Sequence, residues 1–404
     1  MIKQFLKKAD PKHLCYWLIN AFVFNICRLI TFRNRNIWCF GESEGKSYVD
    51  NTKYLFEYVN KYDKTIKSVW LTTNKSLIDI IRNKGFLVYN TYSIMGIWYS
   101  LRAGIAIYNK SLGDFGPIPL VGGAKLVTTW HGAGFKRIYR AADTMHGKLV
   151  DIRRALEKIF NWTRMDLLMA TSEYHKKQFL ERFDIEENQI IVTGQPRNDV
   201  FNSFIDRNTI MDNLNINHDY RLVLYMPTYR PKTQGTGIEE NIVKGLINNK
   251  ELERTLIERK MILLIKLHPV SPCLSVNVKE PYVLFSQNEA KVGTQELLGV
   301  ADILITDYSS CFVDYSLLKR PVLFYVPDED DYLPHMEGMD KEYYEICSLC
   351  QARTIKELID FINSPRDVVS HVTNALFEDQ SIDNKCYSAN VYNAIKNRFL
   401  LNDN

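Results

Sequence analysis

The alternation of short apolar runs with helix-like stretches constrains the fold of this chain more than any other feature. Such a βαβ rhythm is typical of a parallel sheet that is covered by helices on both faces. The first predicted strands are Ile37–Phe40, Ser68–Thr72, Leu87–Tyr89, Ile105–Tyr108, Lys125–Thr129, Leu167–Ala170 and Ile190–Val192. The helices predicted among them lie near 51–60, 76–84, 93–102, 149–160 and 173–183.

A polar stretch, Asn198 to Tyr220, interrupts this pattern, and we interpret it as a connection between two domains. Further strands are then predicted at Leu222–Tyr225, Met261–Lys266, Tyr282–Phe285, Asp302–Thr306 and Val322–Val326, with helices near 239–258, 294–300, 309–318 and 354–363. A length of 404 residues suits two domains. The sequence therefore predicts an α/β fold with doubly wound, Rossmann-like domains over 36–200 and 215–370 and a helical tail over 371–404.

The amino-acid composition disfavours some classes of function. The chain is 46% hydrophobic and 24% charged, as expected of a folded globular protein, and its net charge of +4 is modest. No basic stripe interleaved with aromatic residues is present, which disfavours a nucleic-acid binder. Eight cysteines are scattered, and only Cys347 and Cys350 have CxxC spacing, without the second pair that a zinc site needs. We read all of them as reduced thiols and predict no obligatory metal and no cofactor.

The segment over 1–35 is basic and amphipathic. Its apolar stretch from Leu14 to Ile26 is flanked by Lys and Arg residues, and no small-residue cleavage site supports a secretory signal. On a helical wheel one polar arc contains His13, Asn20, Asn25, Arg28 and Thr31. A spanning helix needs ~20 apolar residues without such a stripe. We therefore expect a helix that lies among lipid headgroups, the alternative being an amphipathic helix packed on its own protein.

Two histidines each lie just beyond the end of a predicted strand. His131 is followed by a Gly-Ala-Gly run and two cations, and His268 is followed by Pro269. In open α/β sheets, ligands bind beyond the carboxyl ends of the strands, so both rings are candidate site residues of two domains that face one cleft. A neutral imidazole can take a proton from a hydroxyl group that attacks a phosphate. The alternative is a buried structural histidine at each strand end. The glycines and cations disfavour it for His131, but it stays open for His268.

The strongest local pattern runs from Thr306 through Asp307 to Ser309 and Ser310. A buried strand leads here into a serine-capped helix, where free N–H groups and the helix dipole favour an anion. An ordinary helix cap is the alternative, and it is compatible with phosphate binding.

Cations occupy three further strand ends. Arg197 follows the last strand of the first domain, and Thr228 and Arg230 follow the first strand of the second. Arginine on such loops suits phosphate recognition, the alternative being a surface charge. Lys266 lies on the same side of an extended segment as His268, so both could face a phosphate.

Taken together and in this order, these segments resemble the CDP-glycerol glycerophosphotransferase family of teichoic acid and capsule synthesis. The matching motifs are Trp130–Gly132, Gly194–Asp199, Pro227–Arg230, Lys266–Pro269 and Thr306–Ser310. The resemblance implies a GT-B-like fold whose second domain holds the nucleotide, and peripheral attachment to the cytoplasmic face of the bacterial inner membrane. It also implies transfer of glycerol phosphate from CDP-glycerol to a hydroxyl group, with release of CMP.

The resemblance places the catalytic roles on His131, as the candidate general base, and on His268. The residues assigned to the donor and its phosphates are Arg197, Thr228, Arg230, Lys266, Thr306, Asp307, Ser309 and Ser310. The expected partners are CDP-glycerol or CDP-ribitol, a membrane surface, and a lipid-linked saccharide or polyol-phosphate acceptor. The Gly-Ala-Gly run after His131, where the polymerase branch has Gly-Thr-Pro, favours primer-type addition over polymerisation. Three alternatives stay open: a ribitolphosphotransferase, a GT-B glycosyltransferase that uses a nucleotide sugar, and a non-catalytic nucleotide-binding scaffold.

Overall fold

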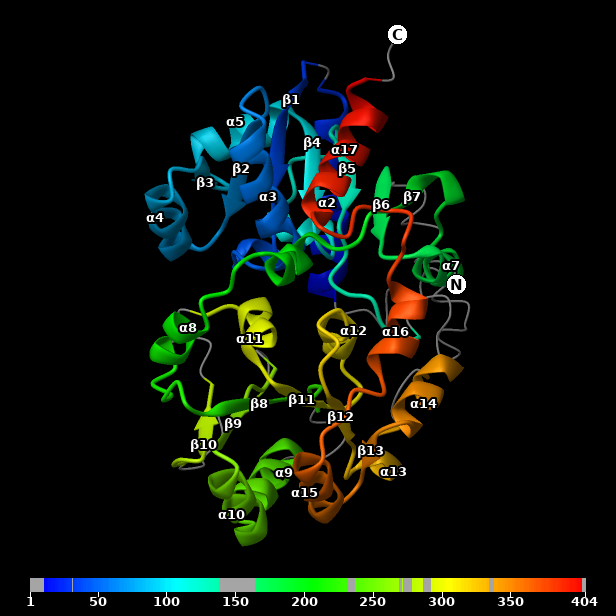
Figure 1. The fold of residues 1–404 in the computed structure, drawn as a ribbon. Helices are drawn as coiled ribbons and strands as arrows, with labels where there is room; N and C mark the ends of the chain where they lie inside the picture. Colours follow the sequence, from blue (N-terminus) through cyan, green and yellow to red (C-terminus); the bar gives the residue numbers. More distant parts are fainter. Residues whose placement is uncertain are drawn as a thin grey trace. The chain divides into compact units, whose positions relative to one another are not determined.

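The computed structural model describes residues 11–30, 32–137, 164–230, 237–268, 271, 278–285, 292–333 and 338–401 of the chain. These residues form two compact units. Unit 1 consists of the described residues of Met1–His131, Tyr139–Asp199 and Asp379–Asn404, and unit 2 of those of Gly132–Ile138 and Val200–Glu378. The chain therefore passes from unit 1 to unit 2 twice, between His131 and Gly132 and again between Asp199 and Val200, and its C-terminal part belongs to unit 1 (Figure 1).

Unit 1 contains a seven-stranded parallel sheet in the order β3-β2-β1-β4-β5-β6-β7. The strands are β1 Asn34–Phe40, β2 Lys67–Thr72, β3 Val88–Asn90, β4 Ala103–Tyr108, β5 Lys125–Thr128, β6 Leu167–Ala170 and β7 Ile190–Val192. The helices of the unit are α2 Pro11–Arg28, α3 Asp50–Tyr62, α4 Lys75–Asn83, α5 Ile94–Arg102, α7 Glu173–Arg182 and α17 Tyr387–Phe399. The strand order reverses between β1 and β4, which is where doubly wound sheets bind ligands.

Alternation along the strands explains how both faces of this sheet are covered. Trp38 and Phe40 of β1 are buried with α3 and α17 on one face, whereas Cys39 is buried on the other face with Phe24 of α2 and Tyr99 of α5. Figure 1 shows α3 and α17 on the same side of the sheet. The C-terminal helix thus contributes to the core of unit 1.

Helix α2 packs one of its faces on unit 1. Ala21, Phe24 and Cys27 are buried, and so is Asn20, which the sequence had placed on the polar face. That assignment was wrong for Asn20, because the helix buries this side against the protein. The side chain of His13 and the whole of Thr31, which belong to the same predicted face, lie outside the described residues. No described helix has the length and apolar character needed to cross a bilayer.

Unit 2 contains a six-stranded parallel sheet in the order β10-β9-β8-β11-β12-β13. The strands are β8 Arg221–Met226, β9 Met261–Ile265, β10 Tyr282–Leu284, β11 Ile303–Thr306, β12 Val322–Tyr325 and β13 Gln351–Ala352. The helices are α8 Arg207–Asn213, α9 Ile238–Ile247, α10 Lys250–Glu258, α11 Thr294–Val300, α12 Cys311–Ser316, α13 Glu329–Tyr332, α14 Lys341–Ser348, α15 Ile355–Asn363 and α16 Ser370–Phe377. The switch in strand order falls between β8 and β11.

The expectation of an α/β fold with two Rossmann-like domains is confirmed. Several boundaries differ. The helix predicted near 239–258 is broken into α9 and α10, because the Asn249 side chain accepts a hydrogen bond from the Leu252 N–H and starts a second helix. The helix predicted over 309–318 is the shorter α12, and α8 lies inside the predicted connection. The helix predicted near 149–160 lies outside the described residues.

Candidate functional site

Polar side chains of unit 1 gather where the strand order reverses. Glu42 follows β1, Asn109 follows β4, and Thr129 follows β5. The Asn109 Nδ2 donates a hydrogen bond to Glu42 Oε1 (3.2 Å), and the Thr129 hydroxyl donates one to Asn109 Oδ1 (3.3 Å). The carboxyl ends of these three strands are therefore joined by side chains, next to the position of His131.

Glu42 is a residue that the motif analysis missed. It is buried and accepts hydrogen bonds from the hydroxyls of Thr52 (2.6 Å) and Ser43 (2.9 Å). Burial, and then the negative charges of Asp50 and Asp114, raise the pKa of Glu42 well above its ordinary range. The only signal in the sequence was the position of this residue, just after a predicted strand.

His131 keeps an exposed surface at the end of β5, beside the ring of Trp130 (centroids 4.3 Å apart). Loss of solvation lowers the pKa of His131 to about 4; Lys110 and Arg197 lower this pKa further, whereas Asp50 opposes them. The imidazole is therefore neutral at physiological pH, which is the form that can accept a proton.

Arg197 holds the turn that carries His131. Its buried Nη1 donates hydrogen bonds to Asp50 Oδ1 (2.9 Å) and to the main-chain carbonyl of His131 (3.0 Å). The main-chain N–H of Arg197 donates a hydrogen bond to Asn51 Oδ1 (3.1 Å), and Asn51 Nδ2 in turn donates one to the Trp130 carbonyl (2.8 Å). Sequence reasoning expected Arg197 to face donor phosphates. Within unit 1, these hydrogen bonds use Arg197 to hold the loop around His131 in place.

Arg230 is also bonded within the protein. Its side chain is 2% exposed and forms ion pairs with Asp307 (2.9 Å), whose side chain is fully buried, and with Asp328 (2.7 Å). The Tyr332 ring lies 4.2 Å from the guanidinium and stacks on the ring of Tyr308. Because two carboxylates already balance this charge, we assign Arg230 to the stability of unit 2 rather than to the donor.

The two loops at the switch point of unit 2 are tied together. The Thr228 N–H donates to Asp307 Oδ1 (2.8 Å), and the Thr306 hydroxyl donates to the carbonyl of Met226 (2.7 Å). Thr306 and Asp307 thereby join the ends of β8 and β11, and both are fully buried. The Thr228 hydroxyl is buried and has no hydrogen-bond partner among the described residues, which leaves it available to a ligand.

Ser309 and Ser310 precede α12 and are half-buried. Ser310 is the residue at the helix N-cap, but its side chain makes no capping hydrogen bond, while Ser309 Oγ accepts one from the Cys311 N–H (3.4 Å). The Ser310 side chain therefore does not act as an ordinary helix cap. Since α12 has six residues, hydroxyl and N–H groups rather than a long helix dipole would bind an anion here.

Two lysines, Lys136 and Lys266, interact electrostatically with Cys311. Lys266 is buried at the end of β9, and burial lowers the pKa of this lysine to about 8. Burial also lowers the pKa of Lys136 to about 8, with Asp307 opposing and Arg230 adding to the shift. Cys311 raises both pKa values. Two desolvated cations within electrostatic reach of Cys311, the first residue of α12, favour the binding of an anion.

The segment that carries Lys136 is built into unit 2. Phe135 stacks on Phe312 of α12 (centroids 5.9 Å apart, planes at 10°), and its carbonyl accepts a hydrogen bond from the Asp340 N–H (2.8 Å). A Cβ added to Gly134 would lie 2.9 Å from the Ser310 Cβ, so the backbone runs against that serine. Sequence reasoning had placed this segment in the first domain, although it noted the two cations after His131.

His268 is exposed after β9, and its ring centroid lies 5.9 Å from that of Tyr229, in the loop after β8. Its carbonyl accepts a hydrogen bond from the Ser271 N–H (2.9 Å). Pro269 lies outside the described residues. His268 therefore belongs to the same group of strand ends in unit 2 as Thr228 and Lys266.

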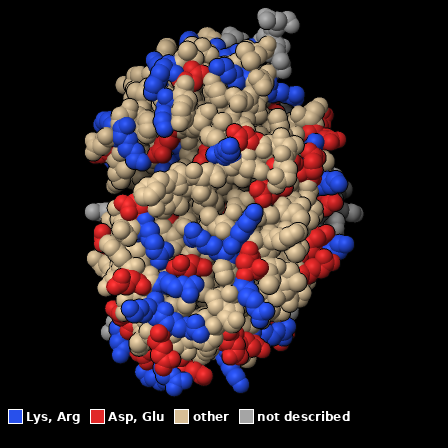
Figure 2. All heavy atoms as spheres, viewed as in Figure 1, with Lys and Arg blue, Asp and Glu red and all other residues tan. Residues whose placement is uncertain are grey.

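Other candidate chemistries find less support. Burial raises the pKa of Cys347 to about 12 and that of Cys350 to about 11, so these thiols are poor nucleophiles. Among the described residues no group of three or more His, Cys, Asp or Glu could hold a metal ion. Lys and Arg are interspersed with Asp and Glu on the face drawn in Figure 2, unlike the basic stripe of a nucleic-acid binder.

Comparison with known proteins identifies the family of the chain. The family described as CDP-Glycerol:Poly(glycerophosphate) glycerophosphotransferase matches residues 23–396. The teichoic acid poly(glycerol phosphate) polymerase of Bacillus spizizenii is 27% identical over 378 residues, which cover 90% of this chain and 91% of that protein. The teichoic acid ribitol-phosphate primase of the same organism is 29% identical over 51% of this chain and 52% of its own length. The chain spans less than half the length of the polymerases of Staphylococcus epidermidis and Bacillus subtilis.

Solved structures show the same fold. The wall teichoic acid polymerase TagF superimposes with a TM-score of 0.75 at 22% identity, over 99% of this chain and 98% of that one. A putative UDP-N-acetylglucosamine 2-epimerase from Listeria monocytogenes gives a TM-score of 0.54 at 13% identity, over 91% and 97% of the two chains.

Proposed function

The chain belongs to the CDP-glycerol:poly(glycerophosphate) glycerophosphotransferase family and is a transferase of that class; on this premise we propose that it moves glycerol phosphate from CDP-glycerol to a hydroxyl group of a membrane-linked acceptor and releases CMP. The family match over 23–396 carries the proposal, because it includes every residue of the candidate site. Attack by the acceptor oxygen on the glycerol-bearing phosphorus forms one P–O bond and breaks the bond to the bridging oxygen, which leaves with CMP.

His131 is the proposed general base. Its lowered pKa keeps the ring neutral, and the approach of an anionic donor raises this pKa, so the ring becomes a better base when the substrate is present. Arg197 acts through the backbone by holding the His131 carbonyl, so it is a positioning residue.

The donor phosphates are proposed to bind in unit 2. Ser309, Ser310 and the desolvated Lys266 supply hydroxyls and a cation, Lys136 adds a second cation, and His268 stabilises charge on the departing CMP. Charge stabilisation carries most of a phosphoryl transfer, so the loss of either lysine should weaken donor binding and turnover together. Asp307 and Arg230 support these loops from within the core.

A second donor has a specific observation in its favour. Similarity to a ribitol-phosphate primase extends over 51% of this chain, so CDP-ribitol is the alternative donor for the same site. The reaction would keep its mechanism and change only the polyol.

The acceptor is proposed to be a lipid-linked saccharide or polyol phosphate at the cytoplasmic face of the membrane, with α2 lying on the lipid surface. Relatives are named for teichoic acid synthesis, and α2 exposes large apolar side chains such as Phe22 and Ile26. Addition of a primer unit is favoured over polymerisation on the Gly-Ala-Gly sequence after His131.

The deciding experiment measures release of CMP from CDP-glycerol by the full chain with a lipid-linked acceptor, with CDP-ribitol and UDP-sugars in parallel. Acceptor-dependent CMP that falls about 10²–10⁴-fold in His131→Ala and His268→Ala is expected. His371→Ala, an exposed histidine of α16, is the matched control and should keep full activity. Release of a nucleoside diphosphate from a UDP-sugar, or activity retained in both site variants, would contradict the proposal.

A further inference from the structure

Asp50, the first residue of α3, has no role in the transfer reaction as proposed. Its side chain is 21% exposed. Asp50 Oδ1 accepts one hydrogen bond from Arg197 Nη1 (2.9 Å) and another from the main-chain N–H of Asn51 (2.8 Å). Among the described residues no group donates a hydrogen bond to Oδ2. One carboxylate oxygen of Asp50 is therefore fixed by the protein, and the other is not.

Two sets of hydrogen bonds connect the start of α3 to the loop that carries His131. The Arg197 nitrogen that donates to Asp50 also donates to the His131 carbonyl (3.0 Å). Asn51, the next residue of α3, donates from its Nδ2 to the Trp130 carbonyl (2.8 Å). The alternative for Asp50 is an ordinary acidic residue at a helix start, where the helix dipole favours it. That alternative accounts for neither connection.

The backbone is strained on both sides of this connection. Asp50 and Trp130 have φ values of 60° and 56°, in the left-handed region that non-glycine residues rarely adopt. The other non-glycine residues of unit 1 with such a φ, among those that the structure describes, are Ser43 and Glu44 in the loop after β1. Strain of this kind persists where surrounding bonds hold the backbone, which is typical of functional sites. The bonds from Arg197 and Asn51 do so here.

The charge of Asp50 also acts on the His131 ring. The charged groups that influence this ring are Asp50 of α3, Lys110 after β4 and Arg197 after β7. Burial has the largest effect and lowers the pKa of His131 to about 4; Asp50 raises this pKa, and the two cations lower it. The negative charge of Asp50 thus favours the imidazolium, which is the form that the ring takes after it accepts a proton.

A second carboxyl group lies near Asp50 but differs from it in charge. Burial most of all, and then the charges of Asp50 and Asp114, raise the pKa of Glu42 well above its ordinary range. These influences favour the neutral form of Glu42. Asp50 is therefore the carboxylate whose negative charge acts on His131.

We propose that Asp50 is the carboxylate partner of His131, which positions the imidazole through Arg197 and Asn51 and stabilises the imidazolium that forms during transfer. A carboxylate beside an imidazole base orients the ring and balances its positive charge in this way. The inference deepens the proposed function, because it rests on His131 as the general base. Asp50 acts through the histidine and is a positioning residue.

The proton explains when Asp50 acts. The acceptor oxygen forms a bond to the glycerol-bearing phosphorus, and its proton passes to the His131 ring. The bond from phosphorus to the bridging oxygen breaks, and CMP leaves with the electron pair; the ring then releases the proton to water. The ring is positively charged only during this step, so the charge of Asp50 favours turnover rather than binding of the donor.

Titration of the His131 ring tests this proposal in the full chain without substrate. Asp50→Asn removes the charge but keeps an oxygen that can accept the bonds from Arg197 and Asn51, and asparagine tolerates a left-handed backbone. The imidazole is titrated by NMR, with its signal assigned by its loss in His131→Ala. The proton affinity of the ring should fall at least about threefold in Asp50→Asn. Arg197→Ala, which removes a positive charge, should raise it.

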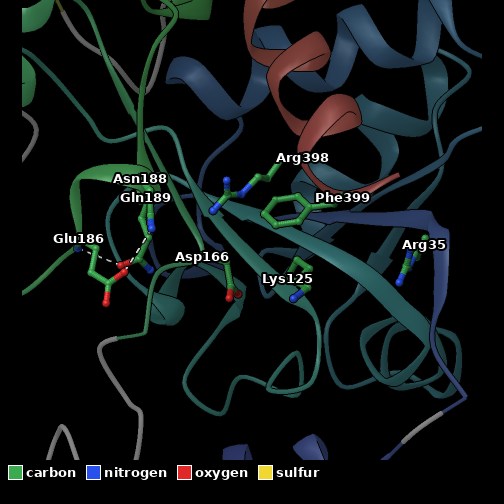
Figure 3. Close-up of a pocket in the computed structure, with 8 residues that line it drawn as sticks. All are labelled: Arg35, Lys125, Asp166, Glu186, Asn188, Gln189, Arg398 and Phe399. Carbon is green, nitrogen blue, oxygen red and sulfur yellow. Dashed lines mark hydrogen bonds between the residues drawn. The ribbon is translucent and has the colours of Figure 1, made fainter. Parts of the chain in front are cut away.

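Asp166 provides a matched control in the same unit. Its side chain is also 21% exposed, pairs with Arg164 (3.0 Å) and accepts a hydrogen bond from the main-chain N–H of Leu126 (2.7 Å). Asp166 precedes β6, whereas His131 follows the parallel strand β5, so the two lie at opposite ends of these strands. Figure 3 shows Asp166 in the lining of a pocket there, together with Lys125, the first residue of β5. Asp166→Asn should leave the titration of His131 and the turnover rate unchanged.

Steady-state kinetics of CMP release complete the test. Asp50→Asn should lower kcat about 10–100-fold with little change in the KM for CDP-glycerol. Asp50→Glu keeps the charge and should recover part of this rate; a loss as complete as that in His131→Ala would contradict the proposal, even if Asp50→Asn fails to fold. So would an unchanged His131 titration in Asp50→Asn, a raised KM at unchanged kcat, or equal losses in Asp50→Asn and Asp166→Asn. An inactive wild type would refute the glycerol-phosphate transfer, whereas the ring titration would still show whether Asp50 acts on His131.

Discussion

The guanidinium of Arg197 donates a 3.0 Å hydrogen bond to the main-chain carbonyl of His131, and the same nitrogen bonds to Asp50 Oδ1 at 2.9 Å. Trp130, just before the histidine, has a φ of 56°, in the left-handed region that non-glycine residues rarely adopt. The turn that presents the imidazole is therefore held in a costly conformation by a residue that follows β7, two strands away from β5 in the sheet.

Replacing Arg197 with Ala should lower kcat about 10–100-fold with little change in the KM for CDP-glycerol, because the ring loses its position rather than its donor. Arg197→Lys should recover part of the rate, since one ammonium can bond either Asp50 or the carbonyl. Steady-state kinetics check this, with the exposed Arg353→Ala as control. A raised KM at unchanged kcat would instead mean that Arg197 binds the donor directly.

Donor affinity should fall at alkaline pH. Lys136 and Lys266 have pKa values lowered to about 8, so they lose their charge as the pH rises through this value, whereas an ordinary lysine stays protonated. We expect the Kd for CDP-glycerol, measured by calorimetry, to rise at least about tenfold between pH 7 and pH 9.5. Lys266→Arg keeps its charge and should flatten the profile. An identical profile in this variant and in the wild type would exclude Lys266 as a titrating contact.

Gly134→Ala should weaken donor binding. The added Cβ would lie 2.9 Å from the Ser310 Cβ, which is closer than real Cβ contacts, so either the segment with Lys136 or the serine must move. A several-fold higher KM for CDP-glycerol is expected, with unfolding by urea little changed. Gly245→Ala on α9 is the matched control, because the nearest neighbour of its Cβ, the Ile355 Cδ1, would be 3.9 Å away. Equal kinetics in the two variants would contradict the proposed role of this close approach.

Arg230→Ala should destabilise unit 2 by about 3–5 kcal/mol, because it leaves the fully buried Asp307 without its cation. Arg353→Ala, which breaks an exposed pair with Glu329, should cost less than about 1 kcal/mol. Urea unfolding, followed by circular dichroism, gives both free energies. A loss below about 1 kcal/mol in Arg230→Ala would return this arginine to the list of candidate phosphate ligands.

Much of the fold could be read from residue patterns. The strands Leu167–Ala170 and Ile190–Val192 have the predicted bounds, and for the first of them the reason is that a buried parallel strand needs a continuous apolar run. Short elements were missed: β13 is two residues long and α13 four, too short for any periodicity to appear. The break between α9 and α10 was missed as well, since an asparagine cap is a local bond that hydrophobic spacing does not reveal.

The sequence by itself determined the two doubly wound sheets and the positions of His131, His268, Ser309 and Ser310 at strand ends, since these depend on local spacing. Only the tertiary structure decided which polar groups are already bonded to other groups of the protein. Arg197 and Arg230 look alike in the sequence as cations on strand-end loops, yet both are bonded within the protein. Lys136 and Lys266 are desolvated, and Cys311 at the start of α12 influences both of them electrostatically. The physical reason is that burial and pairing depend on groups far apart along the chain, which no local pattern records.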